Sequence, residues 1–433
     1  MTDLTREQPG RAVRHVPLSV LELAPVSEGT GPGEALAAAL DVVATVEAEG
    51  YERIWFAEHH TTPGVVSTSP AVLAAVAAER TRRIRVGSGA VLLAHTPPAV
   101  AVEQFATIAR LHPGRVDLGL GRAGIPSGGA APGSRDARAG APAPAAQPAA
   151  PAAPAPPAQD RWVEGLLVPP PPPFSLTDPG IRERFAARAD VVGRRAEIGD
   201  YRDELAVALD LLGAGRPART GERVVSGVAG GADVQVWALA SSPGESARVA
   251  GELGLPLAAN YHVSPSSVLE TVAAYRDAFR PGVLPAPYVL VSVDVLAAAT
   301  AERAEALGRG FDAWVLAIRS ESGSIPYPHP DAPERSWTTA ERALVADRVR
   351  TRFVGTGEVV ADGLEALVRA TGADELLLTT IAHDVEARTE SFRLVAQAWA
   401  RRRALDVEGD GDETAGGAQH DERAADRADA LVP

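Results

Sequence analysis

Residues 114–124 read GRVDLGLGRAG, and the rest of the chain is organised around this stretch. Apolar residues alternate with aspartate and glycine over residues 116–121, which is the period-2 pattern of a β-strand. Gly119 and Gly121 have no side chain, so another group can lie against the backbone there. Arg122 follows at the carboxyl end of this strand, where parallel α/β sheets and barrels bind their ligands. Its forked guanidinium suits a phosphate or carboxylate, and a turn with an arginine facing solvent is the alternative.

Strand and helix patterns alternate on both sides of this stretch. The expected strands are at residues 16–23, 53–57, 84–93, 115–121, 234–241, 257–263, 288–296 and 375–380. The expected helices are at residues 34–50, 69–79, 98–111, 198–212, 245–253, 265–279, 300–317, 338–351, 356–370 and 384–403. Eight strands, each followed by a helix, predict an α/β fold of the (β/α)8 TIM-barrel type. The first strand continues into APVS (residues 24–27) rather than a G-x-G-x-x-G turn, which disfavours a doubly wound dinucleotide-binding sheet.

A low-complexity insertion interrupts this rhythm after the fourth strand. Residues 127–159 are almost wholly alanine, proline, glycine and serine, and residues 169–173 are five prolines in a row. Such a segment buries too little apolar surface to offset the entropy lost on ordering. We therefore expect residues 128–178 to be a disordered insertion, in which the more apolar residues 161–168 dock on the body.

The composition bounds the domain organisation and the partners. We expect a mobile tail over residues 1–15, a single domain over residues 16–404 and an acidic, disordered tail over residues 405–433. The net charge of −14 argues against nucleic acid and anionic membranes as partners. The absence of cysteine and lysine excludes thiol and Schiff-base chemistry. Neither a long apolar run nor a signal peptide is recognisable, so the cytoplasm is the expected location.

Five stretches resemble the bacterial luciferase-like flavin-dependent monooxygenases. They are RIWFAEHH (53–60), VGSGAVLLAHTPP (86–98), GRVDLGLGRA (114–123), VWALASSPGESARVAGELGLP (236–256) and ADELLLTT (373–380). Each stretch is short, but their order and spacing together are far more specific than any one of them. The family fold is a TIM barrel, which agrees with the independent strand count.

The resemblance implies that the chain binds FMN. Family members usually take up reduced FMN from a separate flavin reductase and use it with O2 to oxidise a small organic substrate. His59, the first histidine of EHH, matches the family's catalytic histidine near the flavin. Gly89 and Ala90 match a position where the family often has a non-prolyl cis peptide against the isoalloxazine ring. Arg122 matches a phosphate-binding arginine.

A serine-rich segment completes the implied cofactor site. Ser241, Ser242, Gly244 and Ser246 match the segment that closes over the FMN phosphate. Serine hydroxyls and free N–H groups at a helix start also form an anion site on physical grounds. The alternative is that these serines only cap the helix at residues 245–253.

Two adjacent histidines after one strand argue against a metal site. His59 and His60 point to opposite faces of the strand, and we find no further ligands for a metal ion. Thr379 and Thr380 end the last strand at the mouth and could contact a ligand, although β-branched residues are ordinary in strands.

The sequence leaves three functions open. The first is an FMN-dependent monooxygenase, in which His59 acts as an acid or base. The second is a deazaflavin-dependent hydride-transfer oxidoreductase on the same barrel. The third is a non-catalytic flavin-binding relative. The insertion lies where relatives have a compact loop near the substrate mouth, so it puts the substrate class in doubt, and the resemblance also allows a homodimer.

Overall fold

The computed structural model describes residues 16–122, 159–175 and 178–415, with side chains up to residue 403. The expectations for residues 1–15, for most of the insertion and for residues 416–433 fall outside this range.

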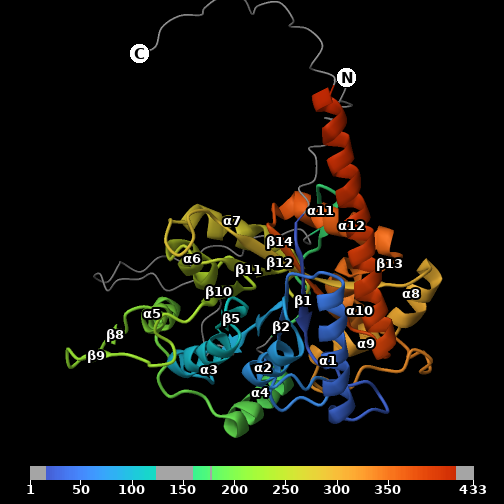
Figure 1. The fold of residues 1–433 in the computed structure, drawn as a ribbon. Coiled ribbons are helices and arrows are strands. Elements are labelled where there is room, and N and C mark those ends of the chain that lie inside the picture. The colour runs from blue at the N-terminus through green and yellow to red at the C-terminus, as the bar shows by residue number, and fades with distance from the viewer. Residues whose placement is uncertain (1–15, 123–158, 176–177, 416–433) are drawn as a thin grey trace, which may run out of the picture.

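The described part of the chain is built on a closed barrel of parallel strands. The ring runs β10–β11–β12–β14–β1–β2–β3–β5 and closes because β5 pairs with β10. Its strands are β1 (Leu18–Glu22), β2 (Arg53–Phe56), β3 (Arg85–Ser88), β5 (Val116–Gly121), β10 (Val234–Ala240), β11 (Leu257–Asn260), β12 (Val289–Ala297) and β14 (Glu375–Thr379). Two short strands, β4 (Val91–Leu92) and β13 (Phe353–Gly355), pair with β5 and β12. The predicted TIM barrel is confirmed, and all eight expected strands are present (Figure 1).

Helices surround the barrel on its outside (Figure 1). They are α1 (Pro32–Ala48), α2 (Pro70–Arg80), α3 (Pro98–Leu111), α4 (Pro179–Val192), α5 (Tyr201–Leu212), α6 (Glu245–Glu252), α7 (Val268–Ala278), α8 (Ala301–Gly308), α9 (Phe311–Ile318), α10 (Thr339–Thr351), α11 (Gly357–Thr371) and α12 (Val385–Ala415). Proline stands in the first turn of α1, α2 and α3, where its missing N–H leaves no hydrogen bond unmade. Thr338 and Thr356 cap α10 and α11 with their hydroxyls.

The alternation in β5 decides how this strand packs. Val116, Leu118 and Leu120 are fully buried in the hydrophobic layer between the strands and the helices. The glycines have the opposite parity and lie on the inner face of the barrel. A Cβ atom on Gly119 would lie 2.1 Å from the Ser88 carbonyl oxygen, which is far too close. The group that lies against Gly119 is therefore β3, and this glycine is required for strand packing.

A second hydrophobic cluster fills the inside of the barrel. In the register of the strands, Leu21 pairs with Trp55 and Ala258 pairs with Leu290. The rings of Trp55 and Trp237 meet edge to face, with their centroids 5.1 Å apart. This cluster separates the amino ends of the strands from the carboxyl ends.

A buried ion-pair network closes the amino ends. The Arg53 guanidinium lies 2.7 Å from Asp117 Oδ2 and 2.7 Å from Glu375 Oε1, and all three side chains are at most 5% exposed. Arg85 binds the other oxygen of Asp117 at 2.6 Å. The Tyr288 hydroxyl donates to Glu375 at 2.9 Å. Each buried charge at this end therefore has an opposite charge and further hydrogen bonds.

Part of the insertion forms a hairpin on the body of the domain. Strands β6 (Arg161–Val163) and β7 (Leu166–Val168) form an antiparallel hairpin around Glu164 and Gly165, whose φ angles of 50° and 80° suit a tight turn. The hairpin docks on the barrel, as predicted for residues 161–168, because the Tyr261 hydroxyl donates to the Leu167 carbonyl at 2.7 Å. The expectation that residues 161–168 dock on the body is therefore confirmed.

Two helices end elsewhere than predicted. The expected helix over residues 300–317 is divided into α8 and α9, because Gly310 between them has a φ of 89°. Helix α12 continues to Ala415 and projects beyond the body (Figure 1), so the predicted disordered tail does not begin at residue 405. Once a helix is nucleated on the body, each further residue adds one hydrogen bond, and residues 405–415 contain no proline to stop it.

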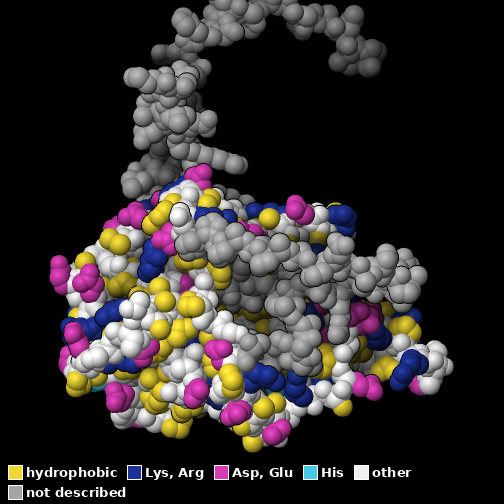
Figure 2. All heavy atoms as spheres, turned by 180° about the vertical axis from the view of Figure 1, so that it is seen from behind, with side chains coloured by type: hydrophobic (Ala, Val, Ile, Leu, Met, Phe, Trp, Pro, Cys, Tyr) yellow, Lys and Arg dark blue, Asp and Glu magenta, His cyan; other side chains and the backbone are white. Residues whose placement is uncertain are grey.

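The described residues include no helix both long and apolar enough to cross a membrane. On the face shown in Figure 2, acidic and basic side chains are both spread among apolar ones.

Candidate functional site

A cavity of about 260 Å³ opens at the carboxyl ends of the barrel strands, and we call it the mouth cavity. Residues from β1, β3, β5, β10, β11, β12 and β14 or from the turns that follow them line it: Leu21, Gly89, Leu92, Gly121, Arg122, Leu239, Ala240, Ser241, Ala258, Ala259, Asn260, His262, Ser292 and Leu377. Ligand sites in TIM barrels lie at this end. The volume is close to the lower end of the roughly 300–1,000 Å³ of small-molecule pockets.

The cavity has an apolar side and a polar side. Leucines line it from β1, β10 and β14, whereas β11 and β12 contribute Asn260, His262 and Ser292. A few placed polar groups in an apolar wall are typical of sites that orient an organic ligand.

His59 follows the end of β2 by three residues and does not line the mouth cavity, but it lies near enough to His262, which does, for its charge to act on that ring. His59 is an even number of residues from Trp55, whose ring is inside the barrel. The backbone N–H of His59 donates to the Ser67 carbonyl at 2.8 Å. Its Nδ1 is buried and has no hydrogen-bond partner among the described residues. Burial lowers the pKa of His59 to about 4, and His60 and Arg188 act in the same direction. The ring is therefore neutral at pH 7.

His262 is a second histidine at this end, which the sequence analysis missed. Its Nδ1 lies 2.7 Å from the Ser292 hydroxyl oxygen. Burial lowers the pKa of His262 to about 4, and a charge on His59 would lower it further. Asn260 and His262 alternate at the end of the β11 pattern LAANYHV. That period-2 spacing, which places both on one face, is the signal that could have found them.

The predicted phosphate arginine lies at the rim of the mouth cavity. Arg122 lines the cavity, and its side chain is 56% exposed. Its guanidinium forms an ion pair with Glu245, the first residue of α6. The cation is therefore where a phosphate could reach it, but a carboxylate competes for it.

The structure brings only part of the serine-rich segment to the cavity. Ser241 lines it, whereas Ser242, Gly244 and Ser246 do not. Gly244 is the N-cap residue of α6, and no side chain caps the helix. The alternative role of these serines as plain caps is therefore wrong, and among the described residues no side chain accepts from the first N–H groups of α6.

The peptide bond between Gly89 and Ala90 is cis, as the resemblance implied. It lies between β3 and β4, so the strand expected over residues 84–93 is divided there. Gly89 lines the mouth cavity and Ala90 does not. A Cβ atom on Gly89 would lie 2.8 Å from a Leu21 methyl group, so a larger residue at this point of the wall would require the Leu21 side chain to shift.

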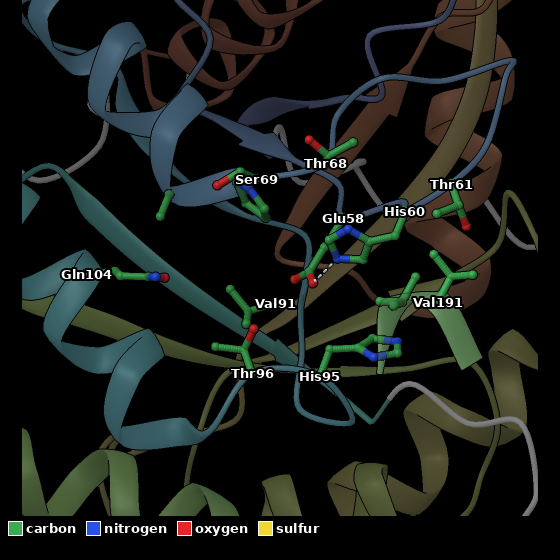
Figure 3. A pocket seen from close by; sticks show the side chains of 13 residues that line it. Glu58, His60, Thr61, Thr68, Ser69, Val91, His95, Thr96, Gln104 and Val191 are labelled. Atoms are coloured by element: carbon green, nitrogen blue, oxygen red, sulfur yellow. Dashed lines mark hydrogen bonds and ion pairs between the residues drawn. The ribbon is translucent and has the colours of Figure 1, made fainter. Parts of the chain in front are cut away.

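His60 points away from the mouth, as predicted for adjacent residues of a strand. It lines a separate cavity of about 430 Å³ that α2, α3 and α4 help to enclose. There its Nε2 lies 2.7 Å from Glu58 Oε1, and its ring meets His95 edge to face (Figure 3). Across the described residues, no group of three or more acidic or histidine side chains is placed to hold a metal ion.

Three orphaned polar atoms belong to residues at or just beyond the carboxyl ends of β2 and β14, although none of these residues lines the mouth cavity. Besides His59 Nδ1, the hydroxyls of Thr379 and Thr380 are buried without a hydrogen-bond partner in the described part of the chain. Buried polar groups are normally paired. Such groups, together with a rim arginine and a wall of leucines, fit a ligand with an aromatic body and an anionic arm.

Comparison with known proteins identifies close relatives. The family model described as luciferase-like monooxygenase matches residues 16–139 and 201–375. The chain is 32% identical over 388 residues to an uncharacterised protein, YvbT, of Bacillus subtilis, covering 89% of this chain and 97% of that one. It is 31% identical over 381 residues to a protein of Escherichia coli named luciferase-like monooxygenase, covering 88% and 96%.

Solved structures share the fold over nearly their whole length. The crystal structure of apo-MsnO8 superposes with a TM-score of 0.64 at 27% identity, covering 89% of this chain and 98% of that one. More distant structures show the fold alone. The oxygenating constituent of 3,6-diketocamphane monooxygenase of Pseudomonas putida, in complex with FMN, has 15% identity, a TM-score of 0.53 and coverage of 89% and 98%. An F420-dependent secondary alcohol dehydrogenase has 13% identity, a TM-score of 0.54 and coverage of 89% and 99%.

Proposed function

The chain belongs to the luciferase-like monooxygenase family, and from this premise we propose that it oxidises a small organic substrate with O2 and reduced FMN. The observation that carries the proposal is the mouth cavity, which Arg122 lines at its rim and His262 lines from β11, with the orphaned nitrogen of His59 close to His262. We also propose that a separate flavin reductase supplies the reduced cofactor.

We propose that residues at the mouth of the barrel would bind the cofactor. Arg122, Ser241 and the free N–H groups of α6 would hold the phosphate. Gly89 and the leucine wall would hold the ring system. When bound, reduced FMN supplies the electrons for oxygen chemistry, and the apolar wall keeps water away from it.

His59 would handle protons in this site. Because its pKa is lowered to about 4, the ring is neutral at pH 7 and can accept a proton from a bound group. Its Nδ1 has no competing partner among the described residues.

A deazaflavin cofactor is the alternative. The F420-dependent dehydrogenase with this fold shows that the barrel can carry that cofactor in another protein. In that case the reaction would be hydride transfer without O2. A flavin-binding protein without catalytic activity is the third possibility, and the neutral His59 weighs against it.

The deciding experiment is a binding titration of the purified full-length chain. FMN, reduced FMN and F420 are titrated separately, followed by fluorescence. We expect micromolar binding of reduced FMN and at least about 10-fold weaker binding in Arg122→Ala, because the phosphate loses a charge-assisted hydrogen bond. The matched control is Arg202→Ala, which removes an exposed arginine paired with Glu252 on neighbouring helices and should bind like the wild type.

The outcomes separate the candidates. An unchanged Kd in Arg122→Ala removes this arginine from the cofactor site. Binding of F420 but not of FMN supports hydride transfer. Binding of FMN without substrate-stimulated O2 consumption, measured with a flavin reductase present, supports the non-catalytic protein. Binding of none of the three cofactors contradicts the proposed function.

A further inference from the structure

The hydrogen bonds around Ser292 determine which nitrogen of His262 carries the proton. The Ser292 hydroxyl oxygen lies 2.7 Å from His262 Nδ1, 3.3 Å from the Ala259 carbonyl oxygen and 3.5 Å from Asn260 Oδ1. Asn260 Oδ1 is itself an acceptor, because the N–H of Val263 donates to it at 2.9 Å. The hydroxyl has one hydrogen and two neighbouring oxygens that can only accept. We expect it to donate to one of them, and it then accepts from His262.

This arrangement leaves the other ring nitrogen with a lone pair. If Nδ1 carries the hydrogen, Nε2 of a neutral imidazole does not. The described residues offer Nε2 no hydrogen-bond partner, and His262 lines the mouth cavity. The backbone supports the ring position, because the His262 N–H donates to the Ser292 carbonyl at 3.2 Å.

The surroundings keep this ring neutral. Burial lowers the pKa of His262 to about 4; Asp294 opposes this shift, while Arg348 and His59 add to it. Asp294 and Arg348 are themselves paired at 3.2 Å and nearly fully buried, so their charges largely cancel. A neutral ring with a free lone pair accepts hydrogen bonds and cannot donate one through Nε2.

The order of the strands assigns this nitrogen to the substrate. The predicted cofactor contacts lie on β3, β5 and β10, through Gly89, Arg122 and Ser241. In the ring of strands, β11 and β12 follow β10. They therefore line the part of the cavity that stays empty when a cofactor lies against the ends of β3, β5 and β10.

We infer that His262 is a ligand-contacting residue: Ser292 fixes its Nδ1–H tautomer, and the bare Nε2 accepts a hydrogen bond from a hydroxyl group of the substrate. That the bound molecule is oxidised rests on the proposed function, whereas the tautomer of His262 and its hydrogen bond to a ligand do not. It names the substrate class as a hydroxyl-bearing organic molecule that fits among leucine side chains.

The first test is the tautomer itself. The full-length chain is labelled with 15N, and long-range 15N–1H spectra are recorded without ligand, with His262 assigned through His262→Gln. We expect Nδ1 to be protonated and Nε2 bare, and we expect Ser292→Ala to give a mixture of tautomers. Ser226→Ala, which removes a surface hydroxyl bonded to Glu103, is the control and should leave the His262 signals unchanged. A protonated Nε2 in the wild type overturns the inference.

The second test uses phenol and anisole, two probes that differ in the hydroxyl hydrogen and a methyl group. We expect phenol to bind at least about 10-fold more tightly than anisole and to move the Nε2 resonance. His262→Leu should abolish that preference, while His262→Gln, which keeps an acceptor, should retain part of it. If His262→Leu does not fold, Ser292→Ala takes its place and should reduce the preference.

The outcomes distinguish this inference from the proposed function. Equal binding of the two probes overturns the inference, and so does an Nε2 resonance that FMN alone moves and phenol does not. A clear preference for phenol in a chain that binds neither FMN nor F420 supports the inference and contradicts only the proposed function.

Discussion

The two ends of the barrel differ in how completely their buried polar groups are paired. At the amino ends, Arg53 binds Asp117 and Glu375, and Arg85 and Tyr288 satisfy the remaining oxygens. At the carboxyl ends, in the described residues, nitrogen and hydroxyl groups are buried without partners, including His59 Nδ1, Thr379 Oγ1 and Thr380 Oγ1. A satisfied network fixes one structure, whereas an unsatisfied one is costly unless a ligand completes it.

The two ends also differ in their titratable side chains. The amino end contains fixed charges of both signs with short ion pairs. The carboxyl end also holds buried ion pairs, Glu22 with Arg388 and Asp294 with Arg348. It adds two histidines whose pKa burial lowers to about 4, so that they are neutral at pH 7. The comparison indicates that the first end supports stability and the second supports chemistry, which is the usual division in this fold.

Removing Arg53, the arginine at the amino ends of the strands, should have the largest effect on stability. Arg53→Leu leaves Asp117 and Glu375 buried beside each other without their shared cation. We expect the free energy of unfolding to fall by about 3–5 kcal/mol in urea titrations at pH 7. The control Arg161→Leu removes an exposed ion pair with Glu270 and should cost less than about 1 kcal/mol. Equal losses in the two variants would show that the network contributes little to stability.

Removing the histidine of the open end should act on turnover. We expect His59→Ala to keep reduced-FMN binding within about 3-fold and to lower kcat at least about 100-fold, because general acid–base catalysis is lost. The measurement is substrate-stimulated O2 consumption with a flavin reductase present. His112→Ala, at the C-terminal end of α3, is the control. Turnover that is the same in both variants would exclude His59 from the reaction.

Acid should weaken the fold through the same histidines. The unfolded chain has ordinary histidines with pKa near 6.5, whereas His59 and His262 have pKa about 4 in the folded chain. Between these values the unfolded chain binds more protons, so the free energy of unfolding falls as the pH is lowered. We expect each histidine to cost about 2 kcal/mol between pH 7 and pH 5.

The variants His59→Gln and His262→Gln isolate this contribution. Each should lose about 2 kcal/mol less than the wild type over that pH interval in urea titrations. His112→Gln should follow the wild type. A pH dependence that neither substitution changes would mean that these rings titrate normally in the folded chain.

The smallest expected effect is at the rim of the mouth cavity, where the ion pair is partly exposed. Glu245 pairs with the half-exposed Arg122 and competes with a phosphate for it. We expect Glu245→Gln to tighten FMN binding by about 2- to 5-fold, since exposed ion pairs are weak. Glu252→Gln, from the exposed pair with Arg202 at the end of α6, is the control. Weaker FMN binding in Glu245→Gln would mean that the carboxylate positions Arg122 instead of competing for it.

Much of the fold was readable from the sequence because its signals are local. The period-2 patterns and the helix patterns lie within single elements, so eight strands and their helices could be placed. The same periodicity predicted that His59 and His60 face different sides, and of the two only His60 lines the cavity of about 430 Å³. It failed at residues 300–317, where the left-handed turn at Gly310 divides a helix without breaking the apolar pattern. The apolar composition of residues 161–168 predicted that they dock, but not that they form a hairpin held by the Tyr261 hydroxyl.

The sequence by itself determined the barrel, the order of its strands along the chain and the candidates His59 and Arg122. Only the tertiary structure decided that β5 pairs with β10, which closes the ring and brings β2 and β11 to one mouth. It also decided that Arg122 is paired with Glu245 and that His262 stands near His59. The physical reason is that local periodicity sets which face a side chain takes. Its neighbours, and with them its charge and its free lone pairs, are set by contacts between residues hundreds of positions apart.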